Sequence, residues 1–154
     1  PAFAFGIHVP GEEILAGLGQ TALLVTHDPE DVFAMATRVA ILERGEIGQC
    51  GPVTEVYRHP ANRYCAECLG PANRLVDPAT GRDRWTRPED CLLPDETADG
   101  SEAVVEEVRG GGARIEVRLA PVRQPGDRWL VHWPDRASVL RLKRGDRIAV
   151  AWRD

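Results

Sequence analysis

Two cysteines are spaced so that they could serve zinc binding or thiol redox chemistry. Cys65 and Cys68 form a C-x-x-C pair. A zinc site needs a second pair of ligands, and neither Cys50 nor Cys91 has another cysteine beside it, while His59 precedes a proline. We therefore expect no metal site, and we expect Cys65 and Cys68 to lie one turn apart on a short helix and to pack as small apolar side chains. The irregular spacing of the four cysteines is typical of proteins in a reducing cytoplasm and not of a disulfide framework.

A histidine stands between an apolar run and a helix-start signal. The run at residues 22–26 predicts a strand that is buried on both faces of a parallel sheet. Asp28 suits an N-cap, Pro29 suits the first helical position, and Asp31 places a carboxylate in the first turn. These roles explain both aspartates without an acid/base pair. His27 thus lies where phosphates bind in α/β proteins, although a lone histidine in such a place is more often a surface or capping residue.

A basic cluster near the end of the chain could bind an anion or a nucleic acid. It consists of Arg141, Lys143, Arg144 and Arg147. Such a run is more often the solvated rim of a hairpin, and the net charge of -5 disfavours a phosphate-rich partner. Binding of single strands would need exposed aromatic side chains, but alternation places several of Trp129, Trp133 and Trp152 on a core face. We expect no nucleic-acid partner.

The first half of the chain predicts an α/β layer around the histidine. After the helix that follows Asp28, residues 39–42 predict a second buried strand, and residues 43–46 predict a turn into a short hairpin. Residues 52–70 predict two short helices that are broken at His59, because proline disfavours helix at the residue before it. The alternation of strand, helix and strand is typical of an α/β layer.

The second half has the pattern of an all-β domain. Residues 71–83 are polar and contain proline and glycine, which predicts a linker. Alternating apolar residues predict strands at residues 115–119, 129–133 and 148–152. Turns are expected at residues 110–112 and 124–127. Short strands with turn signals at this spacing are typical of a small barrel or sandwich.

Several segments of the first half, taken in order, resemble one family. Residues 24–28 (Leu-Val-Thr-His-Asp) and 36–42 resemble the switch-histidine segment of ABC-transporter ATPases. Residues 45–52 resemble the following G-x-I-x-Q-x-G-T/S-P, and residues 55–60 resemble E-(I/V)-Y-x-x-P. Residues 69–73 resemble the (I/L)-G-x-x-N that closes this module in the maltose, polyamine, sulfate and ferric-iron importer ATPases.

The second half resembles the transport-associated OB domain, called TOBE, of the same ATPases. Residues 86–92 are similar to its R-P-E-D/H start, and residues 145–150 to its final strand. Residues 1–20 match poorly, although residues 12–15 are similar to the helix that normally precedes the histidine strand. The resemblance implies an α/β fragment of an ABC ATPase domain followed by an all-β OB-like (TOBE) barrel. The expected boundaries are 1–72 for the nucleotide-binding part, 73–83 for a linker and 84–154 for the TOBE domain.

The resemblance also assigns a role to His27. In the family, this switch histidine reaches the γ-phosphate of ATP and helps to position the attacking water. The chain lacks the phosphate-binding G-x-x-x-x-G-K-[ST], the Leu-Ser-Gly-Gly-Gln signature and an apolar strand that ends in Asp-Glu. Without them Mg-ATP is not held in a productive geometry. We therefore expect the parent protein to use ATP and magnesium, and the chain alone to bind no cofactor and to be inactive.

The implied function is that of the C-terminal regulatory and dimerisation part of an ABC transporter ATP-binding subunit in solute import, with ferric iron or a polyamine as favoured solutes. Its partners would be a second copy of the subunit, contacted through the TOBE domain, and membrane permease subunits. Its place would be cytoplasmic and peripheral on the inner face of the membrane; no apolar run approaches the roughly 20 residues of a spanning helix. An alternative of another class stays open, a stand-alone TOBE-type module that binds a small oxyanion such as molybdate or sulfate.

Overall fold

The apolar segments of the chain assemble into two separate units, Pro1–Gly70 and Pro71–Asp154, in the computed structural model. The structure describes residues 3–8, 23–77, 79–92, 100–111, 114–134 and 137–153. The helix expected around residues 12–15 lies outside these described residues. Within them, no helix is both long enough and apolar enough to cross a lipid bilayer.

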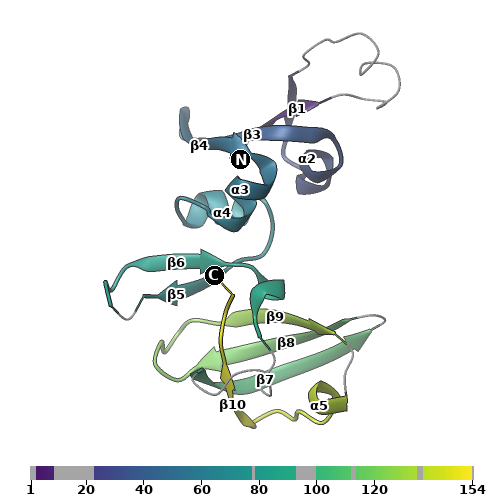
Figure 1. Ribbon diagram of the computed structural model, residues 1–154, viewed down its shortest axis with the longest axis vertical. Helices are drawn as coiled ribbons and strands as arrows, with labels where there is room; N and C mark the ends of the chain where they lie inside the picture. The colour runs from purple at the N-terminus through teal and green to yellow at the C-terminus, as the bar shows by residue number, and fades with distance from the viewer. Residues whose placement is uncertain are drawn as a thin grey trace. The chain divides into compact units, whose positions relative to one another are not determined.

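The first unit contains a four-stranded antiparallel sheet with the order β2-β1-β3-β4 (Figure 1). Its strands are β1 (Phe3–His8), β2 (Leu24–Thr26), β3 (Ala36–Glu43) and β4 (Glu46–Pro52). The sequence analysis missed β1, although large apolar residues alternate with small ones through residues 3–7 with the period of a strand. The predicted turn from β3 into a hairpin strand is confirmed.

The expectation that residues 22–26 form a strand buried in a parallel sheet was wrong. Strand β2 runs antiparallel to β1, with Ala4 opposite Thr26. The side chains of Leu23 and Val25 are 69% and 52% exposed. A continuous apolar run shows that a strand is able to be buried on both faces, but it does not identify the neighbouring strand. Here the neighbour comes from residues 3–8 and runs in the opposite direction.

The first unit contains the helix predicted after Asp28 and the two short helices predicted within residues 52–70. They are α2 (Pro29–Met35), α3 (Val53–Arg58) and α4 (Arg63–Cys68). Asp28 caps α2 by accepting a hydrogen bond from the N–H of Glu30 at 2.8 Å, and Asn62 caps α4 by accepting from the N–H of Cys65 at 2.8 Å. The core of the unit consists of Val32, Val39, Ile41, Val53, Val56, Cys65 and Leu69.

The second unit is built on a four-stranded antiparallel sheet with the order β10-β7-β8-β9. Its strands are β7 (Ser101–Gly111), β8 (Arg114–Pro121), β9 (Trp129–Pro134) and β10 (Arg147–Val150). Figure 1 shows that this sheet curls into a half-barrel, which is consistent with an OB-like β domain. The predicted strands at residues 115–119 and 129–133 are confirmed, and their alternate side chains are buried.

Residues 73–83, where the sequence predicted a linker, contain most of a β-hairpin. Strand β5 (Asn73–Val76) pairs antiparallel with β6 (Asp83–Thr86). The turn between them has Gly81 at φ 68° and carries the polar residues that suggested a loop. A proline and glycine signal therefore identified the turn correctly, but it concealed the short strands on either side. A 3-10 turn η1 (Pro88–Asp90) follows, and a short helix α5 (Ala137–Leu140) precedes β10.

Two tryptophans lie in the core of the second unit, as the alternation predicted. Trp129 and Trp133 are 2% and 1% exposed. Their indole N–H groups donate to the carbonyl oxygens of Arg74 and Cys91, each at 2.9 Å. The buried side chains around them are Cys91, Ala103, Val105, Ile115, Val117, Leu119, Val131, Val139 and Val150. The large aromatic residues therefore satisfy their polar atoms while they fill the core.

A glycine before β7 allows the close approach of β10. A Cβ atom on Gly100 would lie 2.7 Å from the backbone nitrogen and oxygen of Val150. We expect Gly100→Ala to lower the free energy of unfolding by about 1–3 kcal/mol, because backbone atoms of a paired strand cannot move aside without loss of packing. Urea unfolding followed by circular dichroism measures this. Gly110→Ala is the matched control, since nothing lies within 4 Å of a Cβ at that position. Equal losses in the two variants would contradict the explanation.

Candidate functional site

His27 lies in a short loop between β2 and α2 that polar side chains hold in place. The hydroxyl of Thr26 donates to Asp31 Oδ2 at 2.7 Å and accepts from the N–H of Asp28 at 3.1 Å. Asp28 caps α2 through Glu30. The imidazole of His27 is exposed, and it takes part in none of these bonds. The two aspartates therefore have the structural roles that the sequence suggested, and the histidine is presented to solvent at the start of a helix.

Gln49 belongs to a segment that carries the family resemblance, and its role in the structure is to fix a loop. Its amide nitrogen donates to the carbonyl oxygen of His59, and its amide oxygen accepts from the N–H of Ala61, both at 2.8 Å. Asn62 adds a bond from its side chain to Glu43 at 3.2 Å. These contacts tie the break between α3 and α4 to the hairpin β3–β4, so the motif residue stabilises the connection between these two helices.

Cys65 and Cys68 lie one turn apart on α4, as predicted. Cys65 is fully buried, and burial is the main cause that raises the pKa of both thiols, with the charge of Glu43 acting in the same direction. A thiol with a raised pKa is a poor nucleophile and a poor metal ligand. Cys50 is exposed and Cys91 is buried. Among the residues that the structure describes, no group of three His, Cys, Asp or Glu side chains could hold a metal ion.

In the second unit, Asn73 joins the hairpin β5–β6 to strand β9. Its side-chain amide donates to the carbonyl oxygen of Leu130 and accepts from the N–H of the same residue, both at 2.7 Å. The guanidinium of Arg87, which is 1% exposed, donates to the carbonyl oxygen of Pro71 at 3.1 Å. The resemblance singled out Asn73 and Arg87 as motif residues, and both prove to hold the start of this unit against its sheet.

The basic cluster lies on exposed turns around the start of β10. Arg147 pairs with Glu102 at 2.9 Å, and the N–H of Lys143 donates to Asp146 at 2.8 Å. All four basic side chains of the cluster are exposed. The buried Trp129 and Trp133 offer no surface on which a base could stack. The arrangement is that of a solvated rim, which is the interpretation that the sequence favoured.

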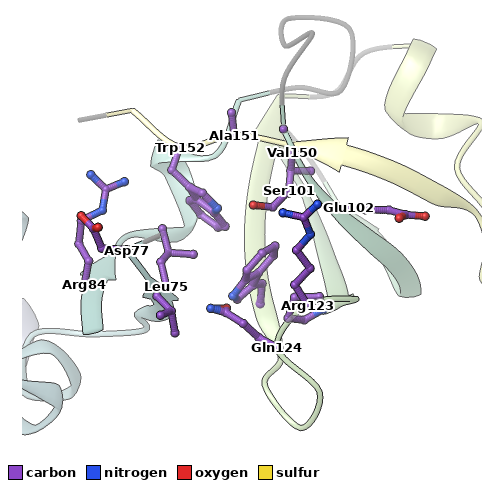
Figure 2. A pocket seen from close by; sticks show the side chains of 14 residues that line it. Leu75, Asp77, Arg84, Ser101, Glu102, Arg123, Gln124, Val150, Ala151 and Trp152 are labelled. Carbon is purple, nitrogen blue, oxygen red and sulfur yellow. The ribbon is translucent and has the colours of Figure 1, made fainter. Parts of the chain in front are cut away.

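A cavity of about 900 Å³ lies in the second unit between the hairpin β5–β6 and the sheet (Figure 2). Figure 2 shows Leu75 and Trp152 on one side of it, and Ser101, Arg123 and Gln124 on the other. The sequence analysis did not find this site, because its walls come from segments that are far apart in the chain and share no motif. The one signal in the sequence that could have suggested the cavity is the mixture of charged and aromatic residues in the segments that line it.

Comparison with known proteins gives the family. No model of a protein family matches the sequence. The chain is 34% identical to the sulfate/thiosulfate import ATP-binding protein CysA 2 of Chromobacterium violaceum, over 71% of this chain and 37% of that protein. It is 32% identical to the spermidine/putrescine import ATP-binding protein PotA 1 of Pseudomonas aeruginosa, over 71% of this chain and 29% of that protein. It is 34% identical to the Fe(3+) ions import ATP-binding protein FbpC of Streptomyces coelicolor, over 67% of this chain and 29% of that protein.

The chain is a homologue of the ATP-binding subunits of ABC importers. This confirms the resemblance that the motifs from residue 24 onward indicated. The chain spans less than two fifths of the length of these three relatives, which is consistent with a C-terminal fragment of such an ATPase.

The bonds of Asn73 lead to a prediction about stability. Asn73→Ala leaves the partly buried N–H and C=O groups of Leu130 without these partners, so the free energy of unfolding should fall by about 2 kcal/mol. Urea unfolding monitored by tryptophan fluorescence measures this. Arg109→Ala is the control, because the Arg109–Glu107 ion pair is exposed and contributes little. If the Asn73→Ala variant were as stable as the Arg109→Ala control, the amide of Asn73 would not anchor the hairpin.

His132 gives the second unit a predicted pH dependence. Burial lowers its pKa below 6.5, Arg114 acts in the same direction, and Glu89 and Glu116 oppose them. The unfolded chain therefore takes up a proton first as the pH falls, so stability is complete above pH 6.5 and decreases below it until the folded imidazole is protonated. Between pH about 7.5 and about 5.5, the free energy of unfolding should fall less for the His132→Gln variant than for the parent chain.

The His132 prediction is checked by urea unfolding at several pH values and by an NMR titration of the imidazole. His59→Gln serves as the control, because His59 is an exposed residue of the first unit. An NMR titration that gave His132 a pKa above 6.5 would contradict the assignment.

Proposed function

We propose that the chain is the C-terminal regulatory and dimerisation part of an ATP-binding subunit that drives solute import. In this proposal the first unit is a remnant of the nucleotide-binding domain, and the second unit is its TOBE domain. The observation that carries the proposal is the match to three import ATP-binding proteins over 67% to 71% of this chain. The order of the motif segments along the chain supports it independently.

Exposed apolar side chains on the first unit agree with this proposal. Leu23, Val25 and Phe33 are 69%, 52% and 49% exposed. Exposure of these side chains is unfavourable, because burial of each would release about 1.5–3 kcal/mol. We propose that the remainder of the ATP-binding domain covers them in a complete subunit, since the relatives are much longer than this chain.

His27 is proposed as the switch histidine of that complete subunit. Hydrogen bonds of Thr26, Asp28 and Asp31 hold the loop that carries His27, so the backbone below the exposed imidazole is fixed in position. A donor at this position would contact the terminal phosphate and help to position water, while ATP and magnesium would be bound by residues outside this chain. The chain alone supplies the histidine without the phosphate-binding loop, so we propose that it is inactive alone.

The proposed partners follow from the same family. They are a second copy of the subunit, contacted through the second unit, and the membrane permease subunits, with the ATPase on the cytoplasmic face of the membrane. The relatives are named for sulfate or thiosulfate, for polyamines and for ferric ions. These solutes share neither charge nor shape, so the proposal is for solute import as a class.

A chimera tests the role of His27. The chain would replace the matching part of the Chromobacterium violaceum relative, and the chimera should hydrolyse ATP, as measured by phosphate release. His27→Ala should lower the rate by about a hundredfold, because a group that positions the nucleophile is lost. His59→Ala, in a loop away from the strand end, should change the rate less than about twofold.

Retained ATP binding by the His27→Ala chimera would show that the variant is folded. Two results would count against the proposal: full ATPase activity of the His27→Ala chimera, or ATP turnover by the isolated 154-residue chain.

A further inference from the structure

The cavity of the second unit has the size of a small-molecule site. Its volume of about 900 Å³ lies within the range of such sites. One wall is formed by the hairpin β5–β6 with Leu75 and Arg84, and the other by the sheet with Ser101 and by the turn after β8 with Arg123 (Figure 2). Trp152, which follows β10, closes one side.

One basic side chain of the cavity has no partner among the described residues. Glu102 is paired with Arg147 at 2.9 Å, and the carboxylate of Asp77 accepts from the N–H groups of Ala79 and Thr80, both at 2.8 Å. These two acidic groups of the walls are therefore engaged in other contacts. Arg123 forms neither an ion pair nor a hydrogen bond with any residue in the described ranges, and its side chain is exposed.

Two buried polar atoms at the cavity lack partners among the described residues. They are the indole nitrogen Nε1 of Trp152, which is a donor, and the amide oxygen Oε1 of Gln124, which is an acceptor. Buried polar atoms without hydrogen bonds are rare in folded proteins and cost free energy. Both atoms are inaccessible to water in the structure, so a ligand would reach them only after rotation of these side chains. The ligand should carry both an acceptor and a donor.

The apolar part of the cavity favours an organic ligand. The rings of Trp129 and Trp152 meet edge to face, with centroids 5.6 Å apart, and Leu75 lies on the hairpin side. A tetrahedral inorganic oxyanion would leave the apolar walls without contacts. A carbon skeleton would make contacts with these walls.

We propose that this cavity binds a small hydroxycarboxylate. The carboxylate accepts hydrogen bonds from Arg123 and from the indole N–H of Trp152, and the hydroxyl donates to the amide oxygen of Gln124. The carbon skeleton lies against Leu75 and Trp129. This site goes beyond the transport function proposed above and does not depend on it, because it is defined by the second unit alone.

A pair of probes that differ in one hydroxyl tests the proposal on the full 154-residue chain. L-malate carries the hydroxyl and succinate lacks it. We expect saturable binding of L-malate with a dissociation constant below about 1 mM by titration calorimetry, accompanied by a change in tryptophan fluorescence. Succinate should bind about five- to tenfold more weakly, because Gln124 then remains unpaired.

Substitutions assign the contacts to individual residues. Arg123→Gln should weaken L-malate binding at least about tenfold, as expected for the loss of a charge-assisted bond. Gln124→Met should remove the difference between L-malate and succinate while succinate still binds. Arg144→Gln is the control, because this exposed arginine is outside the cavity lining. The thermal midpoint of each variant shows whether it is folded, and Arg123→Lys, which keeps the charge, should lose less affinity than Arg123→Gln.

Three results would overturn the proposal. The first is the absence of saturable L-malate binding by the folded chain. The second is sulfate binding as tight as that of L-malate, which would favour the simple oxyanion module instead. The third is an equal loss of affinity in Arg123→Gln and Arg144→Gln, which would show a general effect of surface charge. None of these results bears on the ATPase activity of the chimera, so the two proposals fail separately.

Discussion

The paired hydrogen bonds between the side chain of Asn73 and the backbone of Leu130 position the rest of the second unit. The amide offers a donor and an acceptor to one residue, as a neighbouring strand would, at 2.7 Å for each bond. The bond from Trp129 to the carbonyl of Arg74 joins the residue after Asn73 to the residue before Leu130 and reinforces the contact. These bonds hold the hairpin at the sheet edge, and the contacts proposed for a ligand in the cavity depend on that placement.

The first unit depends on a different constraint, since large apolar side chains among its described residues remain exposed. Helices α2, α3 and α4 bury a small core that includes Val32, Ile41 and Cys65, whereas Leu23 and Val25 remain exposed. The polar bonds around Thr26 nevertheless hold the histidine loop in a defined shape. A local network of hydrogen bonds can therefore preserve the geometry of a loop even where the surrounding apolar surface is not buried.

The residues that carried the family resemblance differ in what their side chains contact. Gln49, Asn73 and Arg87 make hydrogen bonds to backbone atoms and support the fold. The exposed side chain of His27 makes no such contribution within the described part of the chain. The resemblance identified both kinds of residue together, because a motif records which residues occur at a spacing and not what each one contacts.

Elements with local signals could be predicted from the amino-acid sequence. Asp28 and Pro29 start a helix, His59 marks the break between two others, and the alternation through residues 129–133 places its tryptophans in the core. The pairing of the strands could not be predicted, because it depends on contacts between distant segments. The fold joined β2 to the unpredicted β1, turned the expected linker into a hairpin, and assembled the cavity. Helix starts and alternation depend on neighbouring residues, whereas the bond between Asn73 and Leu130 joins residues 57 positions apart.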